Sequence, residues 1–269
     1  MADLLEDLLT DLGAEGDVLW NAVSGLDDDG WATPTPAAGW RVATQIAHLL
    51  WTDETAALAA HSVEGEQEKA AWDEVVLRAI ADPSGFVDTS AHEVARLRPQ
   101  ALLARWGSAR TALADALRGF PTGARMPWFG PPMSPSSMAT ARFMETWAHS
   151  LDVLEALGLT PERSDRVRHV AHLGVRTRDY AFGVHELAPP AEEFRVELAA
   201  PSGDTWTWGP PDATQRVTGS AYDFALLVTQ RVHRHDTDLE AVGADAEQWL
   251  EIAQCFAGPP GAGRESSGG

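Results

Sequence analysis

The sequence predicts an α+β protein in which a bundle of four main helices precedes a smaller domain of mixed strands and helices. Apolar residues recur at helical spacing over residues 1–158, and they alternate with polar residues after Pro189 and Pro190. The length of 269 residues also exceeds the usual size of a single domain. We therefore expect a helical domain over 1–158 and a mixed α/β domain over 162–257.

The bundle helices are predicted from apolar residues three or four positions apart. The segments with this spacing cover about residues 4–25, 42–60, 88–118 and 135–157. Pro99 is a candidate break in the third helix, and Ser134 before Pro135 is a typical cap and first residue for the fourth. A more polar stretch from Glu64 to Ile80 is also expected to be helical.

The second domain is predicted from a change of period. A helix over about 162–185 is expected to link the two halves. Phe194, Val196 and Leu198 then alternate with charged residues as in a half-buried strand, and a hairpin partner with two alternating tryptophans, Trp206 and Trp208, follows. Two further helices are expected over about 220–231 and 245–256. The tail 258–269 is rich in Gly, Pro and Ser and is expected to be disordered.

The charge of the chain limits its partners. With 40 acidic and 20 basic residues, the formal net charge is -20, which would repel a nucleic-acid backbone and an anionic membrane surface. The N-terminus carries acids where a signal peptide has basic residues, and Cys255 is the only cysteine, so no intramolecular disulfide can form. We therefore expect a cytoplasmic protein that acts on a small molecule, as a monomer or a homodimer.

Glu145 and His149 are the first candidates for chemistry. They lie four residues apart, so on a helix they project from the same face and can bind one metal ion together. Their neighbours are largely apolar, and an ionised glutamate in such a place is costly unless it is paired or coordinated. The alternative is that the two side chains bond to each other or to Arg142.

His48 lies beside the apolar stripe of the second predicted helix. If this helix packs against the fourth, two imidazoles and one carboxylate come together, which is a ligand set of zinc sites that keep an open position. The same ligands also suit iron and nickel. A buried histidine with a purely structural role is the alternative.

Three segments of the chain resemble the DinB-like superfamily, in particular the branch of mycothiol-dependent maleylpyruvate isomerases and their metal-binding relatives in actinobacteria. The matching segments are Gly39-Trp40-Arg-Val, Ile-Ala-His48-Leu and Glu145-Thr-Trp-Ala-His149-Ser-Leu-Asp152. The resemblance implies that His48, Glu145 and His149 bind zinc. The segment from Val217 to Arg231 also resembles the family's helix that carries a functional arginine, which implies Arg231 as the first choice, with Arg234 as the competing residue.

Three functions agree with these residues. In the first, a low-molecular-weight thiol such as mycothiol is activated at the metal and serves an isomerase or S-transferase, while Arg231 holds a substrate carboxylate. In the second, the metal activates water or polarises a carbonyl without a thiol, as in a hydrolase, lyase or isomerase of secondary metabolism, with Asp152 either as base or as an orienting residue. The third is a metal or small-ligand binding module without catalysis. The tryptophans do not decide among these, because Trp40, Trp51 and Trp147 can line a pocket or fill the core.

Overall fold

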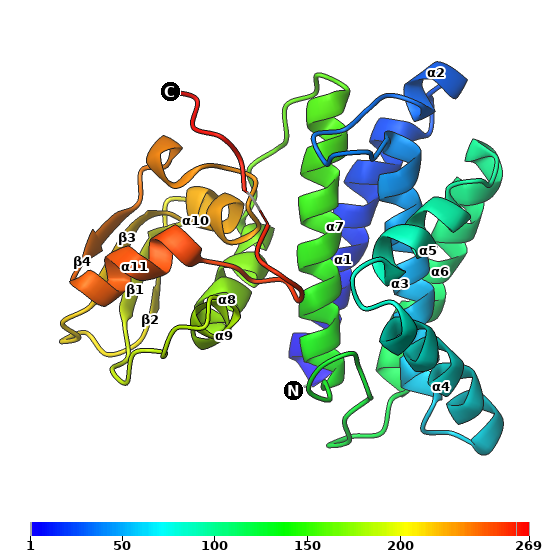
Figure 1. The fold of residues 1–269 in the computed structure, drawn as a ribbon, viewed down its shortest axis with the longest axis horizontal. Helices are drawn as coiled ribbons and strands as arrows, with labels where there is room; N and C mark the ends of the chain where they lie inside the picture. The colour runs from blue at the N-terminus through cyan, green and yellow to red at the C-terminus, as the bar shows by residue number, and fades with distance from the viewer. Residues whose placement is uncertain (1, 262, 269) are drawn as a thin grey trace. The chain divides into compact units, whose positions relative to one another are not determined.

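The computed structural model describes residues 2–261 and 263–268, and the chain divides into two compact units, Met1–Pro161 and Glu162–Gly269 (Figure 1). The first unit is helical. Its elements are α1 (Ala2–Val23), α2 (Asp28–Trp31), α3 (Val42–His61), α4 (Glu66–Ala81), α5 (Phe86–Val94), α6 (Pro99–Gly119) and α7 (Pro135–Ala156). The helix-rich first unit and the mixed second unit confirm the predicted α+β class.

The four long helices α1, α3, α6 and α7 form the bundle. Helix α3 packs against α6 and α7, and α1 packs against α7, while α5 covers a further side of α3. The third predicted helix is two helices, because Pro99 opens α6 at its first position and α5 ends at Val94. The predicted cap of α7 is present, since the Ser134 side chain accepts a hydrogen bond from the backbone N–H of Ser137.

Two apolar clusters fill the bundle. Each contains residues of all four long helices. One is built around Leu19, Ile46, Leu49, Trp106 and Val153, and the other around Leu8, Ala56, Leu113, Leu117 and Met138. Between them on α3 stand polar residues, so the core is interrupted by a buried polar layer.

An ion pair between α3 and α7 is the centre of this polar layer. Arg142 and Asp53 are 2 % and 3 % exposed, and the Arg142 Nε lies 3.0 Å from Asp53 Oδ1. Arg142 Nη2 also donates to Thr52 Oγ1 at 2.5 Å, and Trp106 Nε1 donates to Asp53 Oδ2 at 3.2 Å. Burial raises the pKa of Asp53, and the Arg142 guanidinium opposes that rise.

The second unit is built on a four-stranded sheet with the order β2-β1-β3-β4. The strands are β1 (Arg195–Ala199), β2 (Thr205–Trp208), β3 (Arg216–Ser220) and β4 (Glu240–Val242). The predicted hairpin is β1 and β2, which pair antiparallel, whereas β1 and β3 are parallel. The strands β3 and β4 were not predicted. They are short, and the segment of β3 runs directly into α10 (Ala221–Val228), whose N-terminus is capped by the Ser220 hydroxyl.

The helices of the second unit are shorter than the sequence predicts. The expected helix over 162–185 consists of the 3₁₀ turn η1 (Asp165–Val167), α8 (Arg168–Arg176) and α9 (Arg178–Val184). It breaks at Thr177, whose hydroxyl bonds the carbonyls of Leu173 and Gln254. Likewise, α11 (Ala244–Ile252) ends before Ala253, because the next residues are extended and the Cys255 N–H donates to the Val228 carbonyl. A second 3₁₀ turn, η2 (Arg234–Asp236), precedes β4. Disorder of 258–269 stays a prediction.

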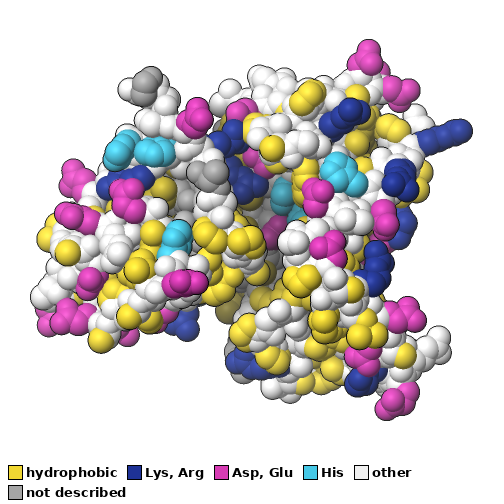
Figure 2. Space-filling model, in the orientation of Figure 1, with side chains coloured by type: hydrophobic (Ala, Val, Ile, Leu, Met, Phe, Trp, Pro, Cys, Tyr) yellow, Lys and Arg dark blue, Asp and Glu magenta, His cyan; other side chains and the backbone are white. Residues whose placement is uncertain are grey.

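Acidic side chains are spread over the face drawn in Figure 2 and do not gather in one patch. In the described part of the chain, residues 2–261 and 263–268, no helix is both long and apolar enough to cross a lipid bilayer.

The buried ion pair leads to a prediction for stability. Arg142→Met should lower the free energy of unfolding by about 3 to 5 kcal/mol, because it leaves the Asp53 carboxylate buried without its charge partner. The measurement is urea denaturation followed by circular dichroism.

Arg105→Met is a matched control, since Arg105 also pairs with an acid of α3, Glu54, at 2.7 Å, but half of its side chain is exposed. It should cost about 1 kcal/mol or less. Equal losses in the two variants would contradict the role given to the buried pair.

Candidate metal centre

Helices α3 and α7 carry the three predicted metal ligands. His48 lies on α3, and Glu145 and His149 lie one turn apart on α7. The i, i+4 spacing puts the two α7 side chains on the same face, and the packing of α3 against α7 brings that face to His48. Residues 97 or more positions apart in the chain therefore meet between two helices.

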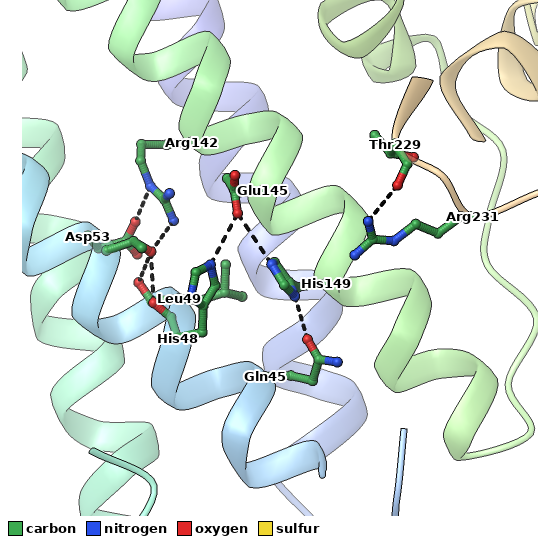
Figure 3. A network of polar contacts seen from close by, with 10 residues as sticks. Gln45, His48, Leu49, Asp53, Arg142, Glu145, His149, Thr229 and Arg231 are labelled. Carbon is green, nitrogen blue, oxygen red and sulfur yellow. Dashed lines mark hydrogen bonds and ion pairs between the residues drawn. The ribbon is translucent and has the colours of Figure 1, made fainter. Parts of the chain in front are cut away.

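The donor atoms of these residues converge on one point (Figure 3). Glu145 Oε2 lies 3.1 Å from His48 Nε2 and 3.3 Å from His149 Nε2. The ligand atoms of the three residues all lie within 4.8 Å of one another. Among the residues that the structure describes, these form the one group of three or more His, Cys, Asp or Glu side chains close enough to share a metal ion.

The distances agree with the donor set of a tetrahedral site. Ligand atoms about 2.0 to 2.1 Å from an ion stand about 3.3 Å apart along the edge of a tetrahedron. The two distances from Glu145 Oε2 to the imidazole nitrogens, 3.1 and 3.3 Å, are close to that edge. The side chains thus fit one divalent ion with three protein ligands.

Burial sets the protonation states of the cluster. His48 is 6 % exposed, and burial, followed by the nearby His149, lowers its pKa to about 4. Burial alone would raise the pKa of Glu145, but the hydrogen bonds of His149 and His48 outweigh it and hold that pKa well below the ordinary range. A neutral His48 and an ionised Glu145 are the forms that bind a metal ion.

Gln45 is a contact of the cluster that sequence reasoning missed. It lies on α3, one turn before His48, and its Oε1 forms a short hydrogen bond with His149 Nδ1. Its Nε2 donates to Thr35 Oγ1 at 2.8 Å. The signal in the sequence was its spacing of three residues from His48, which puts both side chains on one helix face.

Aromatic side chains stand beside both imidazoles. The Trp40 ring is stacked on the His149 ring, with 5.8 Å between the ring centroids and 13° between the ring planes. Its centroid lies 5.3 Å from that of the His48 ring. Gly39 makes this placement possible, because its φ of +77° turns the chain just before Trp40. Trp51 lies 6.3 Å from His48, whereas Trp147 is buried in the bundle.

Arg142 lies on α7, one helical turn before Glu145, and forms its ion pair with Asp53 of α3. Of the two structural alternatives for Glu145, a bond to Arg142 is not among the contacts of the described residues, whereas the bond to His149 is present at 3.3 Å, beside the one to His48 (Figure 3). The arginine instead joins α7 to α3 beside the candidate site.

The remaining predicted residues are placed as follows. Asp152 is buried on α7, three residues beyond His149. Arg231 and Arg234 belong to the second unit. Arg231 follows α10 and donates from Nη1 to the Thr229 carbonyl at 2.6 Å, and Arg234 donates to Thr237 Oγ1 at 3.0 Å. The catalytic or binding roles of Asp152, Arg231 and Arg234 stay predictions. The single cysteine, Cys255, is buried.

Two known family models match parts of the chain. The mycothiol maleylpyruvate isomerase N-terminal domain matches residues 12–154, which include the three candidate ligands. A model described as wyosine base formation matches residues 190–241 in the second unit.

Relatives of similar length are known from Mycobacterium tuberculosis. The uncharacterized proteins MT0041 and Rv0036c are each 56 % identical to this chain over 256 residues, which is 95 % of this chain and 97 % of theirs. The match therefore extends over residues of both units.

Solved structures show the same fold at low identity. The crystal structure of a mycothiol-dependent maleylpyruvate isomerase has a TM-score of 0.57 at 15 % identity, covering 88 % of this chain and 92 % of that one. A histidine-to-alanine mutant of such an isomerase gives 0.59 at 17 % identity, covering 84 % and 89 %. Together with the match over 12–154, this shows that the chain belongs to the family defined by the mycothiol maleylpyruvate isomerase N-terminal domain, as the DinB-like resemblance implied.

Proposed function

We propose that this protein is a metal-dependent enzyme that uses a low-molecular-weight thiol, such as mycothiol, either to isomerise a small carboxylate-bearing substrate or, as an S-transferase, to attach the thiol to it. The observation that carries the proposal is the convergence of two imidazole nitrogens on one carboxylate oxygen, at 3.1 and 3.3 Å, between α3 and α7. Membership in the family of mycothiol maleylpyruvate isomerase N-terminal domains supports the choice of a thiol.

His48, Glu145 and His149 would hold the ion, which is zinc in our proposal, although nickel and iron accept the same ligands. Three protein ligands would leave one position on the ion open for a thiol, and the ion would supply the positive charge that lowers the pKa of that thiol and favours the nucleophilic thiolate. The rings of Trp40 and Trp51 lie beside the histidines and offer an apolar surface there.

The thiolate can add to a conjugated acid and leave again after rotation about the former double bond, which gives cis–trans isomerisation. If it stays attached, the result is S-transfer. In either case Arg231 is our choice for the residue that holds the substrate carboxylate through a bidentate contact. The net charge of -20 and the dispersed acids agree with a small substrate and disfavour nucleic acid.

The metal can be tested directly. Purified protein should contain about one divalent metal ion per chain, and His149→Ala should lose it, because one imidazole and one carboxylate hold zinc poorly. The measurement is elemental analysis by mass spectrometry.

His61→Ala is the matched control, since His61 lies on the same helix as His48 but is exposed and bonded to Glu64. It should keep its metal. Equal metal in the wild type and in His48→Ala/His149→Ala would reject the site.

The thiol can be tested with the cobalt-substituted protein. Titration with mycothiol should produce a sulfur-to-metal absorption band that saturates at micromolar thiol, because the open position accepts the thiolate. The oxidised disulfide of mycothiol should produce none.

The other outcomes select the other functions. No band, together with activity in thiol-free buffer, would favour metal-activated water or carbonyl chemistry, in which Asp152 is the candidate base. Absence of both the band and activity would favour a binding module without catalysis.

The carboxylate contact can be tested by Arg231→Ala. With maleylpyruvate and mycothiol as the first substrates, kcat/KM should fall by a factor of roughly 30 to 4,000, which corresponds to about 2 to 5 kcal/mol. Metal content should not change. Arg234→Ala is the paired variant: if it shows the loss instead, Arg234 takes the role, and if neither variant shows one, the carboxylate contact is wrong.

A further inference from the structure

Gln45 is the residue that connects the candidate metal centre to the loop before α3. Its side chain is completely buried, and both ends of its amide have partners. On one side stands Thr35 of the loop, and on the other stands the His149 ring, which Figure 3 shows between Gln45 and Glu145. An amide fixed at both ends can determine which nitrogen of the imidazole carries the proton.

The first step is the orientation of the amide. The Thr35 hydroxyl donates its single proton to the Trp40 carbonyl at 3.3 Å. Toward Gln45 it can then only accept, so the group facing it at 2.8 Å must be the Gln45 NH₂. The opposite orientation would place two acceptors, the amide oxygen and the Thr35 oxygen, against each other.

The second step is the tautomer of His149. With the NH₂ turned to Thr35, the Gln45 Oε1 faces His149 Nδ1, and an amide oxygen only accepts. Nδ1 must therefore carry the proton. A ring that donates from Nδ1 to Gln45 can also donate from Nε2 to Glu145 Oε2, 3.3 Å away, only as the imidazolium; in the neutral ring Nε2 carries the lone pair, on the side of the other ligands.

The loop that presents Thr35 is itself held in place. Pro34 and Arg41 form an antiparallel bridge, and the Thr35 N–H donates to the Trp40 carbonyl at 2.9 Å. Trp40 stacks on His149 from the same short loop. The loop thus holds the imidazole ring both by its face and, through Gln45, by its Nδ1 edge.

His48, the second histidine of the cluster, has no comparable contact at its Nδ1 in the described part of the chain. His48 Nδ1 is buried and has no hydrogen-bond partner among the residues that the structure describes. The ring of His48 bonds to the Glu145 carboxylate, through Nε2 at 3.1 Å, and has no amide at its Nδ1 among the described residues, so the two imidazoles are not equivalent. The one that Gln45 contacts is oriented before any ion arrives.

We propose that Gln45 is a positioning residue that fixes His149 as the Nδ1–H tautomer and aims its Nε2 lone pair at the position shared with Glu145 and His48. This inference rests on the proposed metal function, and it adds the residue that sets the affinity of the centre. Outer contacts of this kind change metal affinity by roughly 10- to 100-fold when they are removed.

The test uses two readouts on Gln45→Leu and Gln45→Glu. The first is the imidazole ¹⁵N–¹H spectrum of the metal-free protein at alkaline pH, where the rings are neutral. His149 should carry its proton on Nδ1 in the wild type and in Gln45→Glu, whose carboxylate still accepts, but not in Gln45→Leu. The second is the Kd for Co²⁺, which should rise by about 10- to 100-fold in Gln45→Leu and return toward the wild-type value in Gln45→Glu.

Two further variants separate positioning from packing. Thr35→Val removes the group that orients the amide, and it should raise the Kd less than Gln45→Leu does. Thr44→Val is the control, because Thr44 is buried next to Gln45 on α3 but accepts a hydrogen bond from the Arg41 N–H and does not contact the cluster. It should leave both readouts unchanged.

The outcomes are distinct. A proton on Nε2 of His149 in the wild type overturns the inference, and so does an equal loss of affinity in Gln45→Leu and Gln45→Glu. If the wild type has the Nδ1–H tautomer and Gln45→Leu loses it, but the wild type binds no Co²⁺ or Zn²⁺, the assignment of the tautomer stands and the proposed metal function falls.

Discussion

The ion pair between Arg142 of α7 and Asp53 of α3 is buried between the two apolar clusters of the bundle. Two charges in such a place are tolerated only when they meet each other with good geometry. A shift of α7 along α3 by one helical turn would separate them and leave both unpaired. The pair therefore specifies how the two helices align, and the candidate metal ligands lie within about two turns of it on the same helices.

That alignment has a direct consequence for the cluster. Glu145 is three residues beyond Arg142, and His48 is five residues before Asp53, so the carboxylate and the imidazole come together where the ion pair sets the distance between the helices. The apolar surroundings then act on the cluster through their low dielectric. They keep His48 neutral, while the two histidines keep Glu145 ionised. Burial therefore costs free energy when the site forms, and it also favours the protonation states in which the three side chains can bind a cation.

Two further side chains contact the histidines of the candidate centre. Trp40 and Gln45 contact the imidazoles from the loop before α3 and from α3 itself, and neither offers a ligand atom to the shared position. The solved structures with this fold share only 15 % and 17 % sequence identity with the chain. The M. tuberculosis relatives, at 56 % identity, are the natural proteins in which to look for the same contacts.

Local patterns in the sequence were sufficient for the bundle helices, the cap of α7 at Ser134 and the first hairpin of the second unit, because spacing of apolar residues and capping chemistry act over a few residues. The i, i+4 pair Glu145 and His149 was visible for the same reason. The sequence did not reveal the break at Thr177 or the strands β3 and β4. These features depend on hydrogen-bond partners far along the chain, such as the Gln254 carbonyl for Thr177. The contact of Gln45 with His149 joins residues 104 positions apart. Only the packing of α3 against α7 brings them together, because a hydrogen bond between helices is decided by their alignment and leaves no periodicity in the sequence.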